Sequence, residues 1–313
     1  MVVTSLTVRV PAKINLQLAV GPLRPDGYHD LVTVFHAIGL FDMVGVAAAG
    51  ADSVAVTGEG AGQVPADGDN LALRAVRALR AAVSDQASPG VAMTIAKRIP
   101  VAAGLAGGSA DAAAALVACN ELWGTGLTQQ ELCEVGAGVG SDVAFAVVGG
   151  TAVGRGRGER LTPALVSAAR YHWVLAFADG GLSTPEVYGA LDRARTASMA
   201  GSAPAGAAPE PELSTELMAA LRAGDPERLG SSLSNDLQAP AVSLFPALRK
   251  TLEAGREFGA LGALVSGSGP TCFFLARGAS HATDLAVALS GAGVCRSVAR
   301  ATGPAPGAIV IER

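Results

Sequence analysis

A glycine-rich loop followed at once by an alanine-rich helical pattern is the feature that most constrains this chain. The stretch PVAAGLAGGSADAAAA begins at Pro100 and places glycines at positions 104, 107 and 108. Glycine permits left-handed backbone conformations, so several backbone N–H groups can converge on an anion. Ser109 is expected to cap the following helix, whose positive N-terminus favours phosphate. The loop therefore predicts a phosphate site, and the alternative is a flexible turn before a helix.

The loop differs from two common nucleotide-binding loops. A Walker A loop requires Gly-Lys-Ser or Gly-Lys-Thr, and neither follows here. A Rossmann dinucleotide site requires an acidic residue at the end of a second parallel strand, about 20 residues further on, and the sequence offers none there. The phosphate site is therefore predicted to belong to another class.

A lysine and an aspartate stand beside apolar runs, where an unpaired charge is costly to bury. Lys13 lies in PAKINL, and Asp142 lies in VGSDVAF. Taken alone, Lys13 fits a strand lysine whose amine reaches solvent, and Asp142 fits a helix or turn cap. If the two meet beside the phosphate loop, the aspartate can accept a proton from a substrate hydroxyl. The lysine can keep that aspartate ionised and offset charge on a transferring phosphoryl group, so we predict a catalytic pair.

Two turns add candidate ligand contacts. RPDGYHDL places Tyr28 and His29 just after an Asp-Gly turn, where a phenol ring beside an imidazole can stack on and hydrogen-bond a base. The alternative is an ordinary surface turn. VSGSGPTCFFL places Gly267, Ser268 and Gly269 between two strand patterns, where the backbone can closely approach a ligand. The alternative there is a tight hairpin.

The composition fits a globular protein with two domains. The chain has 313 residues, of which 50% are hydrophobic, enough for a large core. A net charge of −4 gives no global basic field, so neither nucleic acid nor a membrane is expected as a partner. The four cysteines are too far apart for a metal knuckle, and the N-terminus lacks the pattern of a signal peptide. We expect a cytoplasmic monomer or homodimer.

Hydrophobic periodicity predicts mixed strands and helices with antiparallel connections, which indicates the α+β class. The predicted strands cover residues 3–11, 14–20, 31–42, 52–57, 91–98, 145–153, 174–178, 263–265 and 271–276. The predicted helices cover residues 70–83, 109–123, 128–137, 212–223, 226–233 and 244–254. The stretch 196–211 is rich in Ala, Pro, Gly and Ser and predicts a surface loop.

PAKINL, the loop from Pro100 and VSGSGPT together resemble, in this order, the three motifs of the GHMP kinase superfamily. The superfamily is named for its galactokinase, homoserine, mevalonate and phosphomevalonate members. The resemblance spans the whole chain and implies an ATP-dependent small-molecule kinase that uses Mg²⁺. It also implies a two-domain α+β fold. Residues 1–163 would resemble domain 2 of ribosomal protein S5, and residues 164–313 would be ferredoxin-like.

The resemblance further implies roles for single residues. Asn15 would lie beside the catalytic pair, and Ser109 would bind phosphate or Mg²⁺. Asn70 and Lys97 are interpreted as adenine contacts from their place in the first domain. The loop would wrap the triphosphate of ATP with Pro100, Val101, Ala102, Ala103, Gly104, Leu105, Ala106, Gly107, Gly108, Ser109 and Ala110.

Within the superfamily, the segments DGYH and GSDVAF are similar to motifs of the kinases of the non-mevalonate isoprenoid pathway. Their substrate is a cytidine diphosphate derivative of methylerythritol, phosphorylated on its 2-hydroxyl. The resemblance implies that Tyr28 and His29 hold cytosine and that Thr184 and Tyr188, in STPEVY, form a second wall. Gly267, Ser268 and Gly269 would also contact this substrate.

Two positions depart from the loop pattern of the family. Ala106 and Ala110 replace a glycine and a serine, and Ala106 is expected to adopt an ordinary α or β conformation.

Three alternative functions remain. One is a kinase of the homoserine or mevalonate type, which needs no base-stacking pair. A second is a non-catalytic ligand sensor of the same fold, against which Lys13 and Asp142 argue. A third is a nucleotide-dependent oxidoreductase, which the missing ribose-binding acid disfavours.

Overall fold

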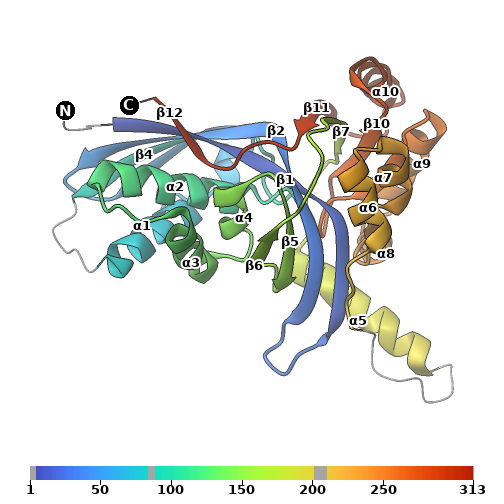
Figure 1. Ribbon diagram of the computed structural model, residues 1–313, viewed down its shortest axis with the longest axis horizontal. Coiled ribbons are helices and arrows are strands. Elements are labelled where there is room, and N and C mark those ends of the chain that lie inside the picture. The colour runs from blue at the N-terminus through green and yellow to red at the C-terminus, as the bar shows by residue number, and fades with distance from the viewer. Residues whose placement is uncertain (1–4, 84–88, 201–209, 313) are drawn as a thin grey trace.

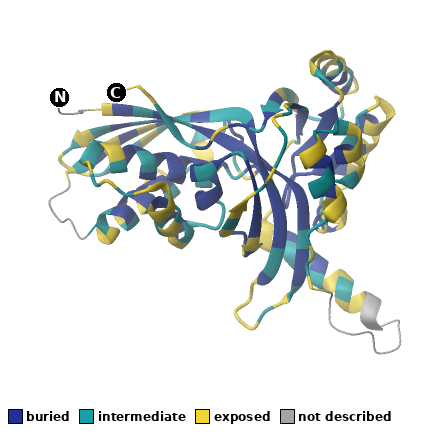
Figure 2. Ribbon diagram, in the orientation of Figure 1, coloured by how far each residue is buried: buried dark blue, intermediate teal, exposed yellow. Residues whose placement is uncertain are grey.

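The computed structural model describes residues 5–83, 89–200 and 210–312. Its strands form a larger and a smaller sheet, each covered by helices (Figure 1). Two long antiparallel strands, β1 (Ser5–Leu23) and β2 (His29–Ala49), run through the centre of the molecule. From residue 10 to residue 18 every side chain of β1 is buried, as the dark blue ribbon in Figure 2 shows. Polar side chains in this stretch must therefore find partners inside the protein.

The larger sheet has the order β12-β1-β2-β4-β3, while β5 pairs with β2 and β6, and β8 pairs with β1. Its other strands are β3 (Ser53–Gly58), β4 (Gly90–Lys97), β5 (Thr151–Gly156), β6 (Arg160–Pro163), β8 (Ser234–Asn235) and β12 (Ile309–Glu312). The last strand, β12, pairs antiparallel with the start of β1. The C-terminal strand therefore lies in the sheet of the first part of the chain, which a division after residue 163 does not anticipate.

Four helices cover one face of the larger sheet (Figure 1): α1 (Leu71–Ala82), α2 (Gly107–Trp123), α3 (Gln129–Val139) and α4 (Val143–Val148). Helix α2 begins directly after the glycine loop, and its alanines are buried in the main core with β1. Small side chains let this helix lie close to the strand. Side-chain caps fix the neighbouring helix starts, with Asn70 on α1 and a Thr128–Glu131 capping box on α3.

The smaller sheet is antiparallel with the order β11-β7-β10-β9, which confirms the expected ferredoxin-like half. Its strands are β7 (Tyr171–Phe177), β9 (Gly262–Val265), β10 (Cys272–Ala276) and β11 (Ser297–Gly303). The helices of this part are α5 (Thr184–Ala200), α6 (Thr215–Ala223), α7 (Pro226–Ser232), α8 (Gln238–Leu244), α9 (Ala247–Glu257) and α10 (Ala279–Gly291). Trp173 and Phe273 pack in the same core as Ile14 of β1, so the two sheets share apolar contacts. Within the described residues, no helix is long and apolar enough to cross a membrane.

Two sequence-based expectations are wrong. Residues 145–153 were expected as one strand, but residues 143–148 form α4 and only Thr151 begins β5. The apolar run is too short for its periodicity to distinguish a helix from a strand. Gly149 and Gly150, both with a φ of 67°, lie between the end of α4 and the start of β5. Residues 196–200 belong to α5 rather than to a loop, and 201–209 lie outside the described residues. The sequence also did not predict α5, α8, α10, β11 or β12.

Candidate active site

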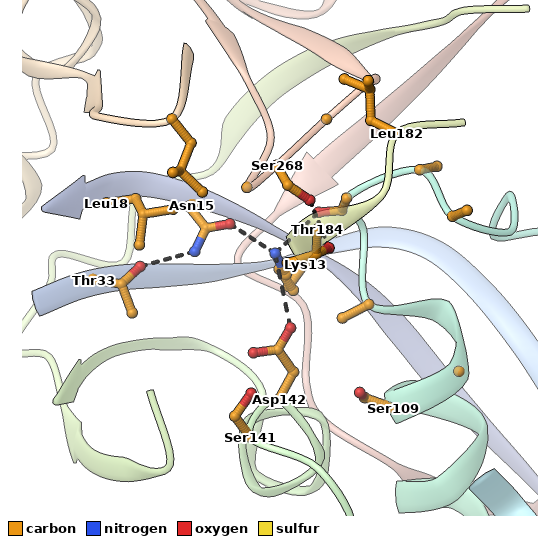
Figure 3. A pocket seen from close by; sticks show the side chains of 18 of the residues that line it. Lys13, Asn15, Leu18, Thr33, Ser109, Ser141, Asp142, Leu182, Thr184 and Ser268 are labelled. Carbon is orange, nitrogen blue, oxygen red and sulfur yellow. Dashed lines mark hydrogen bonds and ion pairs between the residues drawn. The ribbon is translucent and has the colours of Figure 1, made fainter. Parts of the chain in front are cut away.

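A cavity of about 500 Å³ lies where β1, the glycine loop and the turn 266–270 meet. Its lining includes most of the predicted site residues, although they come from both halves of the chain. Among these are Lys13, Asn15, Gly104, Ala106, Gly107, Gly108, Ser109, Asp142, Thr184, Tyr188, Gly267, Ser268 and Gly269. Figure 3 shows Lys13 and Asp142 pointing toward each other, with Ser109 at the start of α2 facing the same space. The structure therefore brings together the lysine, the aspartate and the loop.

Lys13 is buried, and its ammonium group is held by neutral oxygens. Its Nζ donates to Asn15 Oδ1 at 2.7 Å and to the Gly104 carbonyl at 3.0 Å. Asn15 is itself fixed, because its amide donates to Thr33 Oγ1 at 2.8 Å. Burial lowers the pKa of Lys13, and the charge of Asp142 opposes this shift. The lysine thus has a fixed position at the cavity wall.

Asp142 is the anionic partner, and its carboxylate is accessible. Asp142 Oδ2 lies 4.0 Å from Lys13 Nζ, and its side chain is 27% exposed. Asp142 occupies the N-cap position of α4, yet within the described chain its carboxylate makes no capping hydrogen bond. The cap interpretation is therefore not supported. This carboxylate can accept a proton from a hydroxyl that enters the cavity.

The glycine loop contains three left-handed residues, and two of them are alanines. Ala102, Gly104 and Ala106 have φ values of 51°, 75° and 58°. The expectation of an ordinary conformation for Ala106 is wrong, because this residue is the N-cap of α2 and turns the chain into the helix. A left-handed alanine costs about 1–2 kcal/mol. The expectation that Ser109 caps the helix is also wrong: Ser109 is the third residue of α2, and it lines the cavity instead.

Gly104 joins the loop to the second half of the chain. Its carbonyl accepts hydrogen bonds from Lys13 Nζ and from Ser266 Oγ, both at 3.0 Å. A Cβ atom at position 104 would lie 2.1 Å from the Ser266 carbonyl oxygen. Only glycine fits this close approach. One residue therefore couples the glycine loop, Lys13 and the turn 266–270.

A buried charge cluster holds both ends of the loop. Lys97 Nζ donates to Asp42 Oδ2 at 2.5 Å and to Asp111 Oδ2 at 2.7 Å. Asp42 Oδ1 accepts from the N–H groups of Arg98 and Ile99 at the loop entry, while Asp111 lies on α2 at its exit. Burial raises the pKa of Asp111 to about 8, although Lys97 opposes the shift. Burial alone would lower the pKa of Lys97, but Asp111 and Asp42 outweigh it and raise that pKa.

Asn70 and Lys97, the predicted adenine contacts, line a cavity of about 270 Å³ beside the loop, together with Gly107 and Gly108. Their polar groups are bound within the protein. The Asn70 oxygen accepts from two N–H groups of α1, and Lys97 holds the carboxylates just described. The adenine assignment stays a prediction.

A second cavity, of about 710 Å³, adjoins the first and contains the aromatic turn. The His29 ring stacks on Tyr188 with 5.3 Å between ring centroids. His29 Nδ1 lies 3.0 Å from the Gly21 carbonyl and therefore carries a proton, while Nε2 lies 3.4 Å from Asp192 Oδ2. Tyr28 lines the same cavity and is 52% exposed. Three rings thus surround a space that a planar base can enter.

Two family models match the chain: "GHMP kinases N terminal domain" at residues 70–150 and "GHMP kinases C terminal" at residues 217–295. Relatives named 4-diphosphocytidyl-2-C-methyl-D-erythritol kinase are similar over nearly the full length. The Nocardia farcinica protein is 56% identical over 97% of this chain and 96% of its own. The Mycobacterium tuberculosis protein is 53% identical over 98% of this chain and 93% of its own.

The chain belongs to the 4-diphosphocytidyl-2-C-methyl-D-erythritol kinase family of GHMP kinases. A crystal structure of 4-(cytidine 5'-diphospho)-2C-methyl-D-erythritol kinase matches with a TM-score of 0.74 and 32% identity, over 94% of this chain and 98% of that one. A homoserine kinase from Cytophaga hutchinsonii shares the fold with a TM-score of 0.72, at 19% identity, over 99% of this chain and 98% of that one. These matches confirm the resemblance read from the three motifs.

Within this kinase site, several residues were missed by sequence reasoning. Thr33, Asp111, Ser266 and Arg157 hold or line the site. Thr33 and Arg157 belong to no motif that we used, while Asp111 and Ser266 lie within two of the motifs but were given no role. Asp111 carried a usable signal, because a lone carboxylate in an alanine run predicts a buried partner. Thr33, Ser266 and Arg157 carried none, because their roles depend on how distant segments meet.

Tyr188 is excluded as a general base at neutral pH. Burial raises the pKa of its phenol, and Asp142 adds to the shift. The phenol therefore stays neutral, and its ring is available for stacking.

Thr184 and Ser268, two predicted substrate contacts, are joined by a hydrogen bond in the first cavity, with 2.9 Å between Thr184 Oγ1 and Ser268 Oγ.

Proposed function

We propose that this kinase transfers the γ-phosphoryl group of ATP to the 2-hydroxyl of 4-diphosphocytidyl-2-C-methyl-D-erythritol. The observation that carries the proposal is the juxtaposition of two cavities. One contains Lys13, Asp142 and the glycine loop, and the other contains Tyr28, His29 and Tyr188. The first supplies groups for phosphoryl transfer, and the second supplies an aromatic wall for cytosine.

Asp142 acts on the acceptor hydroxyl. Its carboxylate takes the hydroxyl proton as the oxygen forms a bond to the γ-phosphorus and the bond to the β-phosphate oxygen breaks, which releases ADP. Lys13, held by Asn15 and Gly104, places a positive charge 4.0 Å from Asp142 and offsets charge on the transferring group. The N–H groups of the loop and the start of α2 bind the phosphates of ATP.

Mg²⁺ would bind mainly to the triphosphate, with Ser109 Oγ as a protein ligand. Ser109 faces the cavity from the first turn of α2. Among the described residues, no group of three or more His, Cys, Asp or Glu side chains could hold a metal ion. Magnesium commonly keeps few protein ligands beside substrate phosphates. Mg²⁺ binding, the division after residue 163, a cytoplasmic location and a monomeric or dimeric state remain predictions.

The proposal is tested by ADP release with three acceptors, namely 4-diphosphocytidyl-2-C-methyl-D-erythritol, homoserine and mevalonate. We expect turnover with the first alone. Asp142→Asn should keep ATP binding and lose at least about 100-fold in kcat, because a general base is worth about 10²–10⁴-fold. Turnover with only another alcohol would reject the substrate, and near-normal kcat in Asp142→Asn would reject the base. Folded protein that binds ATP and turns over no acceptor would indicate a sensor.

A further inference from the structure

Six residues line both cavities and therefore mark the passage between them: Leu31, Ser141, Arg157, Thr184, Pro185 and Tyr188. Arg157 is the charged member of this set. The aromatic wall lies on one side of the passage, and Lys13 and Asp142 lie on the other. A ligand that reaches from one side to the other must pass Arg157.

The position of Arg157 is fixed by its local backbone. It stands in the turn between β5 and β6, flanked by Gly156 and Gly158, whose φ values are 72° and 104°. Its backbone N–H donates to Glu159 Oε2 at 2.6 Å. The guanidinium carbon lies 5.1 Å from the centroid of the Tyr28 ring, so the aromatic turn supports the side chain.

The guanidinium group is free to bind an anion. Across residues 5–83, 89–200 and 210–312, Arg157 forms no salt bridge. Arg74 lines the second cavity as well, and the carboxylate in that lining, Asp192, lies beside His29. Two guanidinium groups thus face one carboxylate, and this balance favours a negatively charged ligand.

We propose that Arg157 binds the diphosphate that links the cytidine of the acceptor to its methylerythritol part. The inference rests on the proposed function and adds a specificity-determining residue to it. With the base against Tyr28 and Tyr188 and the hydroxyl at Asp142, the diphosphate lies in the passage between the cavities. A planar guanidinium group can donate two parallel hydrogen bonds to phosphate oxygens. Arg157 therefore lets the site distinguish a cytidine diphosphate from neutral cytidine.

Calorimetric titration with cytidine, CMP and CDP tests the inference without requiring turnover. The wild type should bind CDP more tightly than cytidine. Arg157→Ala should weaken CDP binding about 10- to 100-fold, the range of hydrogen bonds to charged groups, and leave cytidine binding nearly unchanged. Arg157→Lys should fall between the two because it keeps the charge without the planar fork. Arg155→Ala is the matched control: Arg155 is an exposed arginine on β5 outside both cavity linings, and its removal should change neither affinity.

Kinetics give a second readout, in which Arg157→Ala should raise the KM of the acceptor and leave the KM of ATP unchanged. If Arg157→Ala weakens cytidine and CDP equally, Arg157 acts through Tyr28 and the inference is overturned. If the variant keeps the wild-type preference for CDP, the inference is overturned while the proposed function stands. If wild-type protein binds neither cytidine nor CDP, the proposed function itself fails.

Discussion

Replacing Gly104 by alanine should disrupt the junction of loop, lysine and turn. The new Cβ would lie 2.1 Å from the Ser266 carbonyl oxygen, so the two segments must separate by about an ångström. Overpacking of this kind costs about 1–3 kcal/mol, and a left-handed alanine costs about 1–2 kcal/mol. The free energy of unfolding should fall by about 2–5 kcal/mol. For a chain of this length that is about 4–10 °C in Tm, at about 2 °C per kcal/mol.

The same movement should reduce activity, because the Gly104 carbonyl is one of the oxygens that hold Lys13. We expect a lower kcat and a higher KM for ATP, measured beside the thermal scan. Gly124→Ala is the matched control, since Gly124 is also left-handed, with a φ of 65°, and a Cβ there meets nothing within 4 Å. It should lose only about 2–4 °C in Tm and keep full activity. Equal losses of Tm and unchanged kinetics in both variants would refute the close approach at Gly104.

Two further predictions concern buried charge. Lys97→Met leaves Asp42 and Asp111 without their cation, so the free energy of unfolding should fall by about 3–5 kcal/mol. The control Lys250→Met changes an exposed lysine and should alter Tm little. Equal Tm values for the two variants would contradict the prediction. His36, packed against Tyr171 and Trp173, has a pKa lowered by burial to about 3. Between pH 6.5 and 3 the unfolded state binds more protons than the folded state. Acidification in this range should therefore lower the free energy of unfolding by about 1.4 kcal/mol per pH unit. His36→Gln should flatten the pH dependence of Tm from pH 6.5 to 5, and an unchanged slope would contradict the assignment.

Sequence alone predicted the kinase family because its signature resides in short motifs, and the roles of the single site residues stay predictions. The loop at 100–110, Lys13 and Asp142 could each be interpreted as an ordinary structural feature. Three motifs in the order of the family are much more specific than any one of them. The ferredoxin-like half was predicted only through the resemblance, since α10 and β11 were not recognised from their own residues. The hydrophobic patterns of these two segments do not distinguish them from turns and loops. The strand order of the sheet depends on contacts between residues far apart in the chain.

The features that sequence missed depend on backbone geometry or on distant contacts. Ala106 looks like an ordinary helix former, but the loop forces it into a left-handed conformation at the N-cap. Lys97 was interpreted as an adenine contact, which stays a prediction, but its bonds to Asp42, 55 residues earlier, and to Asp111 were not foreseen. Arg157 looks like one exposed arginine among many until the two cavities are seen to meet at its side chain.

The arrangement around Lys13 fits the catalytic role that we propose for it. Two neutral oxygens, Asn15 Oδ1 at 2.7 Å and the Gly104 carbonyl at 3.0 Å, hold the amine, while the carboxylate of Asp142 stays at 4.0 Å. A hydrogen bond between the two charged groups would be stronger than either bond from the ammonium group to a neutral oxygen, and Asp142 would have to lose it on taking a proton. At 4.0 Å the two opposite charges still attract each other, yet a proton transfer to Asp142 would break no hydrogen bond between them. The contacts to neutral oxygens therefore position the lysine, and the longer ionic contact leaves the Asp142 carboxylate free for the proton transfer that we propose.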